Sequence, residues 1–211
     1  MVWTTRASAG HALAALLRRQ HIHEQPALIV LGLARGGMIV AAEVARDLRA
    51  PLDVLVVRKL GLPFQPEVAM GALAPGVELL DHAMIAEFGV SAAALQDVVR
   101  REATELQRRS ALYQGNRPAV NLLERTVLLV DDGLATGMTA LAAARSVLTQ
   151  RPTNVIVAAP IGSRDACRRL HESEPRARCI CVHEVDLFGG VGAYYRDFPQ
   201  VSDAEVIASL R

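Results

Sequence analysis

The stretch 127–140 limits how this chain can fold more than any other segment. It begins with the apolar, β-branched run 127–130, which is typical of a fully buried parallel strand. Two adjacent carboxylates, Asp131 and Asp132, follow, and then a short loop rich in Gly and Thr. From 139 to 150 the chain is rich in alanine, which predicts a helix. This order predicts a binding site at the carboxyl end of a parallel sheet.

The residue types at this turn suit a sugar phosphate. Free backbone N–H groups at the start of the helix, together with the hydroxyls of Thr136 and Thr139, suit a phosphate group. The carboxylates of Asp131 and Asp132 suit sugar hydroxyls or a hydrated cation. Two carboxylates at the end of a buried strand are costly without partners, which disfavours a turn that binds nothing.

Three other interpretations of the stretch meet obstacles. It is not a P-loop, because no Lys follows Gly137. It is not the dinucleotide-binding fingerprint, because its glycines do not fall at G-x-G-x-x-G. An acidic pair after an apolar strand can also open a phospho-acceptor receiver domain. That fold needs a further Asp at the end of a later strand, and the next apolar run, 154–160, has none.

The stretch resembles the phosphoribosyl pyrophosphate (PRPP) motif of type I phosphoribosyltransferases. Those enzymes carry two acidic residues, a short spacer, then Thr-Gly and a Thr or Ser. The matching residues here are Asp131, Asp132, Thr136, Gly137 and Thr139. The match is closest to the adenine-type enzymes, which also have an Ala where Ala135 stands. The resemblance implies that 135–139, Met138 included, cradles the 5′-phosphate of PRPP.

Length and composition predict one globular domain. The chain has 211 residues, of which 51% are hydrophobic and 21% charged. A net charge of +1 gives no reason to expect a nucleic-acid or membrane partner. No apolar run is long enough to span a bilayer, and 1–19 lacks a secretory apolar core, so we expect a cytoplasmic protein.

The cysteines and one histidine pair are interpreted as structural or solvated. There are 3 cysteines and no C-x-x-C spacing. Cys179 and Cys181 share one face of a predicted strand, and we expect reduced core residues, with metal binding as the lesser alternative. His21 and His23 lie in a polar stretch, and no third metal ligand is suggested nearby, so a solvated loop is favoured.

From residue 27 onward, apolar strands alternate with helical segments. This order predicts an α/β fold with a largely parallel central sheet flanked by helices. The predicted strands are 27–31, 52–57, 127–130, 154–160 and 178–182. The predicted helices are 6–20, 38–48, 92–113, 139–150, 163–171 and a last helix after Ser202.

A glycine-rich loop, 32–37, joins the first predicted strand to a helix. Its glycines let the backbone approach a ligand closely, and Arg35 adds a planar fork for an anion. A tight structural turn with a solvated Arg is the alternative. In type I phosphoribosyltransferases a comparable loop holds pyrophosphate, often with a strained peptide before the basic residue. The resemblance thus implies a pyrophosphate site at Arg35, Gly36 and Gly37 and a cis peptide between Ala34 and Arg35.

A second basic segment follows the strand 52–57. Arg58 and Lys59 at a strand end, before the Pro- and Gly-containing segment 60–67, predict an anion site under an irregular, mobile cover. The adenine-type enzymes have a similar run before their catalytic loop. By this resemblance Arg58 and Lys59 stabilise the departing pyrophosphate, and Glu67 is a candidate for proton transfer. The segments 68–73 and 77–80 predict a hairpin, and the charges of the helix 92–113 are interpreted as a solvated face.

The tail, 183–211, breaks the strand–helix order. It is rich in aromatic residues and glycine, and flat rings can stack on a planar heterocycle. We interpret Phe188 and Tyr195 as acceptor-binding residues, with packing of a small satellite core as the alternative. A single domain is expected, with a core at about 27–182 and a small hood formed by the tail and the N-terminal helix.

The resemblance implies transfer of a phosphoribosyl group from PRPP to a nitrogen heterocycle, with Mg²⁺ on the donor, in a homodimer. Asp131 and Asp132 then hold the ribose diol and contact the metal indirectly, through the donor or water. Two alternatives stay open: a sensor that binds PRPP and catalyses nothing, and a hydrolase or kinase-like user of the same sugar phosphate. Ala135 replaces a proton-exchanging carboxylate of hypoxanthine–guanine enzymes, which argues against a 6-oxopurine acceptor. Gly37 replaces an aromatic residue of adenine-type enzymes, which argues against a standard adenine pocket.

Overall fold

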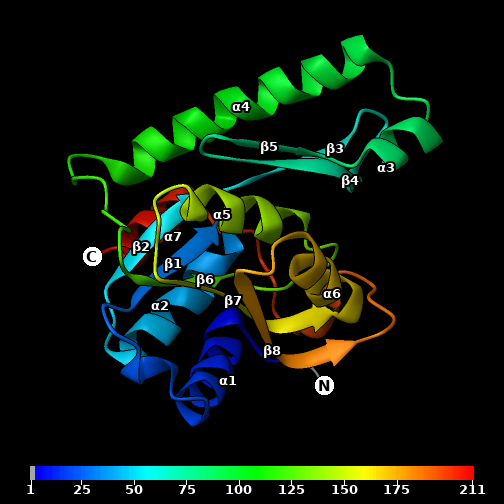
Figure 1. Cartoon of the computed structure of the whole chain (residues 1–211). Coiled ribbons are helices and arrows are strands. Elements are labelled where there is room, and N and C mark those ends of the chain that lie inside the picture. The colour runs from blue at the N-terminus through cyan, green and yellow to red at the C-terminus, as the bar shows by residue number, and fades with distance from the viewer. Residues whose placement is uncertain (1–2) are drawn as a thin grey trace.

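The computed structural model describes residues 3–211 (Figure 1). The α-helices are α1 Arg6–Arg19, α2 Gly36–Leu48, α3 His82–Glu87, α4 Ala92–Gln114, α5 Met138–Leu148, α6 Arg164–Ser173 and α7 Asp203–Ser209. The strands are β1 Ile29–Ala34, β2 Leu52–Val56, β3 Arg58–Leu62, β4 Gln65–Ala74, β5 Val77–Leu80, β6 Thr126–Val130, β7 Asn154–Ser163 and β8 Ala177–Val185. Short 3₁₀ helices span Ile22–Glu24 and Val191–Tyr194.

A five-stranded sheet of order β2-β1-β6-β7-β8 forms the centre of the molecule, and all of its strand pairs are parallel. Every residue of β6 is buried, as expected for an apolar run in the middle of such a sheet. The predicted α/β class with a largely parallel sheet is therefore confirmed. Because β6 is the central strand, the acidic pair that follows it lies at the middle of the carboxyl edge.

The two faces of the sheet are covered by different helices. Ile29 and Leu31 of β1 point toward α5 and α6, whereas Val30 between them points toward α1 and α2. Side chains alternate along a strand, so one apolar run feeds both cores. Figure 1 shows α1 and α2 on one side of the sheet and α5 on the other. Within 3–211, no helix combines the length and the apolar character needed to cross a membrane.

Helix starts agree with the sequence signals. Ser91 caps α4, and its hydroxyl accepts from the backbone N–H of Ala94. Ser163 caps α6 in the same way. Ser202 and Glu205 form the predicted capping box at α7. These residues fix where each helix begins, and in α6 the cap lies beside the candidate phosphate loop.

The segment 58–114, here called the arm, stands apart from the parallel sheet (Figure 1). It contains the antiparallel sheet β3-β4-β5 together with α3 and α4. The arm has a small core of its own, formed by Leu60, Leu62, Met70, Leu73 and Val98. The predicted hairpin of 68–73 with 77–80 is confirmed as β4 and β5.

The prediction of an irregular cover at 60–67 is wrong, because β3 and β4 extend into it. Proline is normally excluded from a central strand, yet Pro66 lies within β4. The pairing shifts there: Leu62 faces Gln65, whereas Gly61 faces Ala69. Pro66 thus occupies an irregular part of the ladder, where its missing N–H breaks no regular hydrogen bond.

The tail packs against the beginning of the chain. The N–H of Trp3 donates to the carbonyl of Tyr194 at 2.9 Å, and the N–H of Arg196 donates to the carbonyl of Trp3 at 2.8 Å. Trp3 and Tyr195 join Phe188 and Phe198 in one apolar cluster. We use the name hood for this cluster and its backbone. Most of α1 packs under the sheet instead, and only its first turns reach the hood.

The expectation of reduced, unlinked cysteines is wrong for Cys179. Cys179 on β8 is bonded to Cys167 on α6, and Cys181 is the free cysteine. The prediction failed because Cys167 lies on a helix twelve residues earlier, and only the packing of α6 on β8 brings the two together.

Candidate functional site

The acidic pair lies at the carboxyl end of β6, between the end of β1 and the start of α5. The backbone N–H of Asp131 still belongs to the sheet and donates to the carbonyl of Ala158 at 3.1 Å. The Oδ1 atom of Asp131 accepts from the backbone N–H of Asp132 at 2.8 Å. The two carboxylates are therefore held side by side at the centre of the sheet edge.

A contact that the sequence did not predict holds the second carboxylate. Arg6 Nε donates to Asp132 Oδ2 at 2.8 Å, and the two side chains are only 9% and 13% exposed. Arg6 Nη1 also donates to the carbonyl of Pro199 at 2.8 Å, and its guanidinium lies 3.6 Å from the centre of the Phe198 ring. Tyr195 completes the arrangement, because its hydroxyl donates to the carbonyl of Asp132 at 2.6 Å. The hood thus fixes both the side chain and the backbone of Asp132.

Burial makes both carboxyl groups weaker acids than usual. Burial raises the pKa of Asp131 well above its usual range, and the neighbouring charge of Asp132 raises it further. Burial also raises the pKa of Asp132, but the hydrogen bond and positive charge of Arg6 oppose this shift. Arg6 therefore favours the ionised form of Asp132, whereas Asp131, which lacks such a direct partner, holds a proton more readily.

Asp131→Asn should stabilise the fold at neutral pH by about 1–2 kcal/mol. The folded state binds the Asp131 proton more tightly than the unfolded chain, so wild-type stability falls as pH rises from about 3.8 to the raised pKa of the folded state. Asparagine removes this penalty and keeps the oxygen that accepts from Asp132. Melting curves across this pH range should show a difference in melting temperature between Asp131→Asn and the wild type that increases with pH. The control Asp186→Asn, at a 78% exposed side chain, should show none. A difference in melting temperature that does not change with pH would contradict a raised pKa of Asp131 in the folded protein.

Two glycines let the β1–α2 turn lie directly against the acidic pair. A Cβ on Gly36 would overlap Asp132 Oδ2 and come within 3.1 Å of Arg6 Nε. A Cβ on Gly37 would come within 2.6 Å of the carbonyl of Val130 and 2.9 Å of Asp131 Oδ1. The predicted pyrophosphate loop and the predicted diol site are therefore parts of one site.

Gly36→Ala should destabilise the protein by about 1–3 kcal/mol, because the added methyl group has to push Asp132 away from Arg6. Denaturant unfolding measures this cost. Gly189→Ala is the matched control, since a Cβ there meets no atom within 4 Å among the described residues. Equal stability of the two variants would show that the turn and the acidic pair are not in close contact.

The segment that was predicted to cradle a phosphate consists of the loop 134–137 and the first turn of α5. Gly137 has a φ of 76°, a conformation that glycine adopts easily. Ala135 and Thr136 are exposed, and the first N–H groups of α5 have no partner within the helix. Ser163 stabilises the loop, because its hydroxyl donates to the carbonyl of Ala135 at 2.6 Å. An anion can thus approach this loop from solvent.

The predicted cis peptide between Ala34 and Arg35 is present. It precedes the Gly36–Gly37 turn, as the family resemblance implied. The guanidinium of Arg35 lies 3.9 Å from Asp203 of α7, with its side chain 29% exposed. Arg35 therefore extends along the rim of the site toward α7 and does not contact the acidic pair.

The other predicted basic residues are paired within the arm. Arg58 donates two hydrogen bonds to Glu102, at 2.6 and 2.9 Å. Glu102 is only 8% exposed, so the interpretation of the α4 charges as a solvated face is wrong at this position. Lys59 Nζ lies 3.1 Å from Glu67, whose side chain is 97% exposed. In this conformation Arg58 and Lys59 point to carboxylates of the arm.

The two predicted acceptor-binding rings differ in their surroundings. Phe188 is partly exposed and lies 5.2 Å from the Tyr194 ring. Tyr195 is 5% exposed and lies between Trp3 and Phe198, at ring distances of 5.8 and 4.9 Å. Its interpretation as a stacking surface is corrected: Tyr195 supports Asp132, and burial raises the pKa of its phenol so that it stays a donor.

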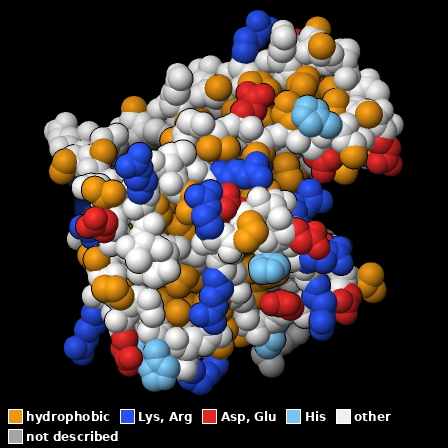
Figure 2. Space-filling model, in the orientation of Figure 1, with side chains coloured by type: hydrophobic (Ala, Val, Ile, Leu, Met, Phe, Trp, Pro, Cys, Tyr) orange, Lys and Arg blue, Asp and Glu red, His pale blue; other side chains and the backbone are white. Residues whose placement is uncertain are grey.

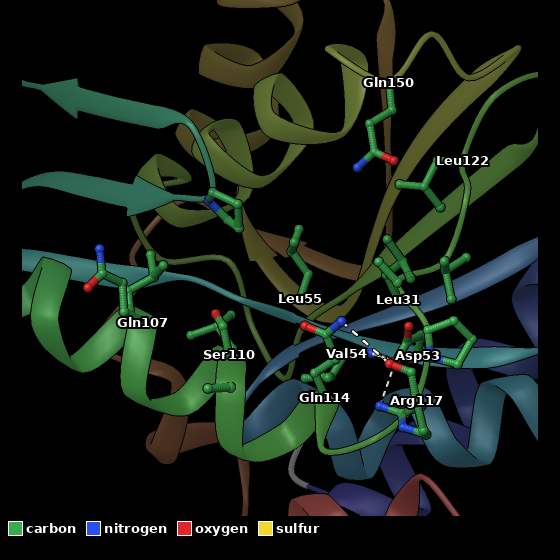
Figure 3. Close-up of a pocket in the computed structure, with 17 residues that line it drawn as sticks. Leu31, Asp53, Val54, Leu55, Gln107, Ser110, Gln114, Arg117, Leu122 and Gln150 are labelled. Carbon is green, nitrogen blue, oxygen red and sulfur yellow. Dashed lines mark hydrogen bonds and ion pairs between the residues drawn. The ribbon is translucent and has the colours of Figure 1, made fainter.

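Two of the cavities in the structure are lined partly by residues of the arm. One of about 530 Å³ lies between β2, the second half of α4 and the connector 117–122, and Figure 3 shows its apolar wall with the 2.9 Å pair of Asp53 and Arg117. None of the predicted site residues lines it. A smaller one, of about 260 Å³, lies between β5 and the α5–α6 pair and includes Arg145 and Arg169. Figure 2 shows Lys and Arg side chains where the arm meets the rest of the molecule.

Comparison with known proteins shows the family of the chain. A family model described as phosphoribosyl transferase domain matches residues 5–198. Two Mycobacterium tuberculosis proteins, named "Putative phosphoribosyl transferase MT0597" (strain CDC 1551) and "Putative phosphoribosyl transferase Rv0571c" (strain H37Rv), are each 43% identical over 206 residues. The match covers 97% of this chain but 45% of each relative, so the chain spans less than half of their length.

Two solved structures share the fold of this chain. The crystal structure of TT1426 from Thermus thermophilus matches with a TM-score of 0.77 and 38% identity, over 100% of this chain and 98% of that one. A hypothetical protein from Neisseria gonorrhoeae with bound ppGpp shares the fold at a TM-score of 0.53 and 15% identity, over 87% of this chain and 82% of that one. Because the family model matches most of the sequence, residues 5–198, the chain belongs to the phosphoribosyl transferase domain family.

Proposed function

We propose that the protein transfers a phosphoribosyl group from PRPP to a nitrogen heterocycle and releases pyrophosphate. One observation carries the proposal. The acidic pair, the Gly36–Gly37 turn and the N-terminal end of α5 meet at the carboxyl end of the central strands. This arrangement supports the proposal, because groups that suit a diol, a pyrophosphate and a phosphate lie close together at one edge of the sheet.

The donor would bind with its ribose over the acidic pair. Asp131 and Asp132 accept hydrogen bonds from the ribose hydroxyls, and the loop 135–139 donates backbone N–H groups and the Thr136 and Thr139 hydroxyls to the 5′-phosphate. In the free protein Arg6 already occupies Asp132 Oδ2. The diol therefore shares Asp132 with Arg6 or takes the place of the guanidinium.

In the reaction the bond from C1′ to the pyrophosphate oxygen breaks, and a bond from C1′ to the acceptor nitrogen forms. The leaving pyrophosphate takes the bonding electron pair, and the acceptor loses the proton from its nitrogen. The sugar gains positive character between these events, and an ionised carboxylate beneath it is stabilising. Arg6 serves this step because its hydrogen bond and positive charge favour the ionised form of Asp132 against the effect of burial.

Pyrophosphate would be held by the backbone at Gly36 and Gly37 and by the side chains of Arg35, Arg58 and Lys59. Arg58 and Lys59 are bound to Glu102 and Glu67 in the free protein. Their use therefore requires the start of the arm to rearrange when the donor binds, which would also exclude water from the reacting sugar.

Mg²⁺ would supply charge neutralisation on the pyrophosphate of the donor. The donor set fits an indirect role, because Mg²⁺ prefers oxygen ligands and keeps several waters. Asp132 Oδ2 is engaged by Arg6 and Asp131 Oδ1 by a backbone N–H. The carboxylates would thus reach the ion through water or through the donor.

The acceptor site would be formed beneath the hood. Ala135 offers no group that exchanges a proton. Either Glu67 accepts the proton from the acceptor nitrogen, or the acceptor loses it without a protein base. Phe188 is the partly exposed ring available for stacking. We therefore propose an acceptor other than a 6-oxopurine, in a protein that functions as a homodimer.

A specific observation also supports a second candidate, a PRPP sensor that catalyses nothing. Both basic side chains expected to hold the leaving group are paired with carboxylates of the arm. A sensor needs the diol and phosphate sites but no stabilisation of a departing pyrophosphate.

The test is release of pyrophosphate from PRPP and Mg²⁺, measured with and without a panel of nucleobases and related heterocycles. Transfer predicts release that depends on one acceptor, with weak or no turnover of guanine and hypoxanthine and loss of acceptor binding in Phe188→Ala. Release without any acceptor would indicate a hydrolase, and donor binding without release would indicate a sensor. Efficient turnover of guanine, at kcat/KM of roughly 10⁴ M⁻¹s⁻¹ or more, would contradict the proposed acceptor class.

A further inference from the structure

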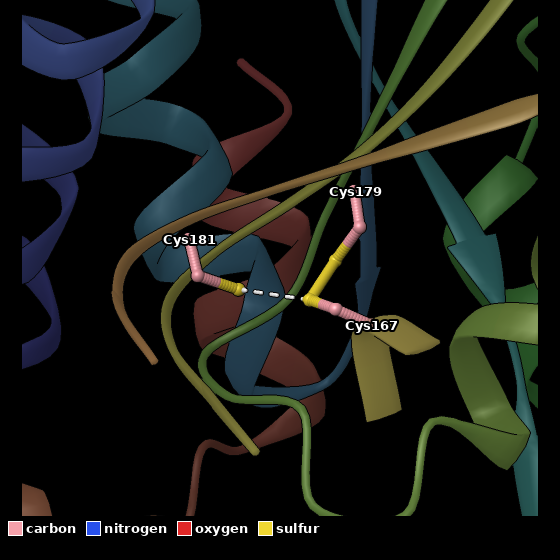
Figure 4. A group of neighbouring side chains, drawn as sticks. All are labelled: Cys167, Cys179 and Cys181. Atoms are coloured by element: carbon pink, nitrogen blue, oxygen red, sulfur yellow. Dashed lines mark hydrogen bonds between the residues drawn. A yellow bond between two sulfur atoms is a disulfide. The ribbon is translucent and has the colours of Figure 1, made fainter. Parts of the chain in front are cut away.

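Among residues 3–211, one group of cysteine, histidine and acidic side chains lies close enough to hold a single metal ion. It consists of Cys167, Cys179 and Cys181, whose sulfur atoms all lie within 4.8 Å of one another. Figure 4 shows the three side chains pointing toward a common centre, with Cys167 bonded to Cys179 and the Cys181 sulfur 3.7 Å from that of Cys167. The proposed function uses none of them.

The fold brings the three sulfurs together from two elements. Cys179 and Cys181 are two apart on β8, so they share one face of the strand, and Cys167 reaches them from α6. Gly162 on β7 leaves the space for Cys181, because a Cβ at this position would come within 2.6 Å of the Cys181 sulfur. All three cysteines are partly exposed, so an ion can reach them from solvent.

A disulfide uses only two of the three sulfurs and leaves Cys181 beside it. When the disulfide takes up two electrons and two protons it becomes two thiols, and the cluster then holds three. Three converging thiols can bind a metal ion that prefers sulfur as thiolates, and their protons are then released to the solvent. A tetrahedral ion with bonds of about 2.3 Å places its sulfur ligands roughly 3.8 Å apart. The 3.7 Å between Cys167 and Cys181 already meets this spacing.

We propose that the reduced protein binds one thiophilic d¹⁰ ion, Zn²⁺ or Cu⁺, through Cys167, Cys179 and Cys181. Zn²⁺ would complete its tetrahedron with a water molecule, whereas Cu⁺ is satisfied by three sulfurs. The ion and the disulfide are mutually exclusive, because they need the same two sulfur atoms. The ion would tie α6 to β8, and α6 is capped by Ser163, whose hydroxyl donates to the carbonyl of Ala135.

The test uses the full chain, reduced without oxygen by a phosphine, which becomes a phosphine oxide as water supplies the oxygen and the protons. Zn²⁺ and Cu⁺ are added in separate titrations against a chromophoric chelator of known affinity, and Co²⁺ replaces Zn²⁺ for absorption spectra. We expect one equivalent of metal bound in at least one titration, and thiolate-to-metal charge-transfer bands with Co²⁺. The titration that shows binding distinguishes the two ions. Less than one equivalent bound in both titrations would overturn the proposal.

Cys181→Ser separates the metal site from the disulfide. It removes the third ligand and leaves Cys167 and Cys179 able to form their bond, so affinity should fall about 100-fold or more while the oxidised variant keeps its disulfide. Cys167→Ser removes the sulfur on α6 and should abolish both, which keeps the test valid if Cys181→Ser does not fold. The control is the double variant His21→Ala with His23→Ala, which should bind the metal with the affinity of the wild type. Wild-type affinity in either folded cysteine variant, or its loss in the histidine control, would overturn the proposal.

Discussion

The folded variant with Asp131→Asn and Asp132→Asn should bind PRPP about 100-fold or more weakly than the wild type, and its pyrophosphate release should fall below detection. Each carboxylate is proposed to accept a hydrogen bond from the ribose diol, and hydrogen bonds to charged groups contribute about 1.5–3 kcal/mol each. Asparagine keeps the size of both side chains but removes their charge. Titration calorimetry in the presence of Mg²⁺ measures the donor affinity.

A matched control checks that the effect belongs to the site. Asp97→Asn makes the same chemical change on the exposed face of α4, where the side chain is 67% exposed and paired with Arg100. Donor affinity should not change in this variant. Undiminished affinity in the folded double variant would rule out the acidic pair as the ribose site.

Arg6→Met should destabilise the protein by about 3–5 kcal/mol at neutral pH, because it leaves the buried carboxylate of Asp132 without its partner. The loss should depend on pH. Without Arg6 the folded-state pKa of Asp132 rises further above its ordinary 3.8, so the variant loses stability as pH increases from that value toward the raised pKa. The difference from the wild type should therefore be small in acid and large at neutral pH. Denaturant unfolding at several pH values measures it.

Turnover should fall about 100-fold in the same variant, since Asp132 would no longer be fixed and ionised beneath the sugar. Arg164→Met is the control, because it removes an ion pair with Asp186 in which both side chains are mostly exposed. That change should cost at most about 1 kcal/mol and leave turnover intact. An Arg6→Met protein with wild-type turnover, or with a stability loss independent of pH, would show that Arg6 does not control the charge of Asp132.

The sequence predicted the parts of the site that are built locally. The apolar run before Asp131 could only be a buried strand, and Gly137 follows within the same strand–turn–helix unit. The glycine turn after β1 was predictable for the same reason. Parallel strands end at one edge of a sheet, so two such units have to bring their turns together. The contacts of Gly36 and Gly37 with the acidic pair confirm this.

Contacts across long sequence separations were not predictable. Arg6 is 126 residues from Asp132, and at the start of an amphipathic helix nothing distinguishes it from a solvated arginine. Glu102 fits a helix face rich in charges, and only the packing of α4 on β3 buries it against Arg58. The aromatic content of the tail was a usable signal, but it could not tell a ring that stacks on a ligand from one, such as Tyr195, that supports a carboxylate backbone.

A crystal structure of the wild-type protein with PRPP and Mg²⁺ would test the central claim most directly. We predict the ribose diol on Asp131 and Asp132, the 5′-phosphate against the loop 135–139, and the pyrophosphate against Gly36 and Gly37. A donor bound elsewhere, for example in the cavity between β2 and α4, with the acidic pair untouched, would contradict it.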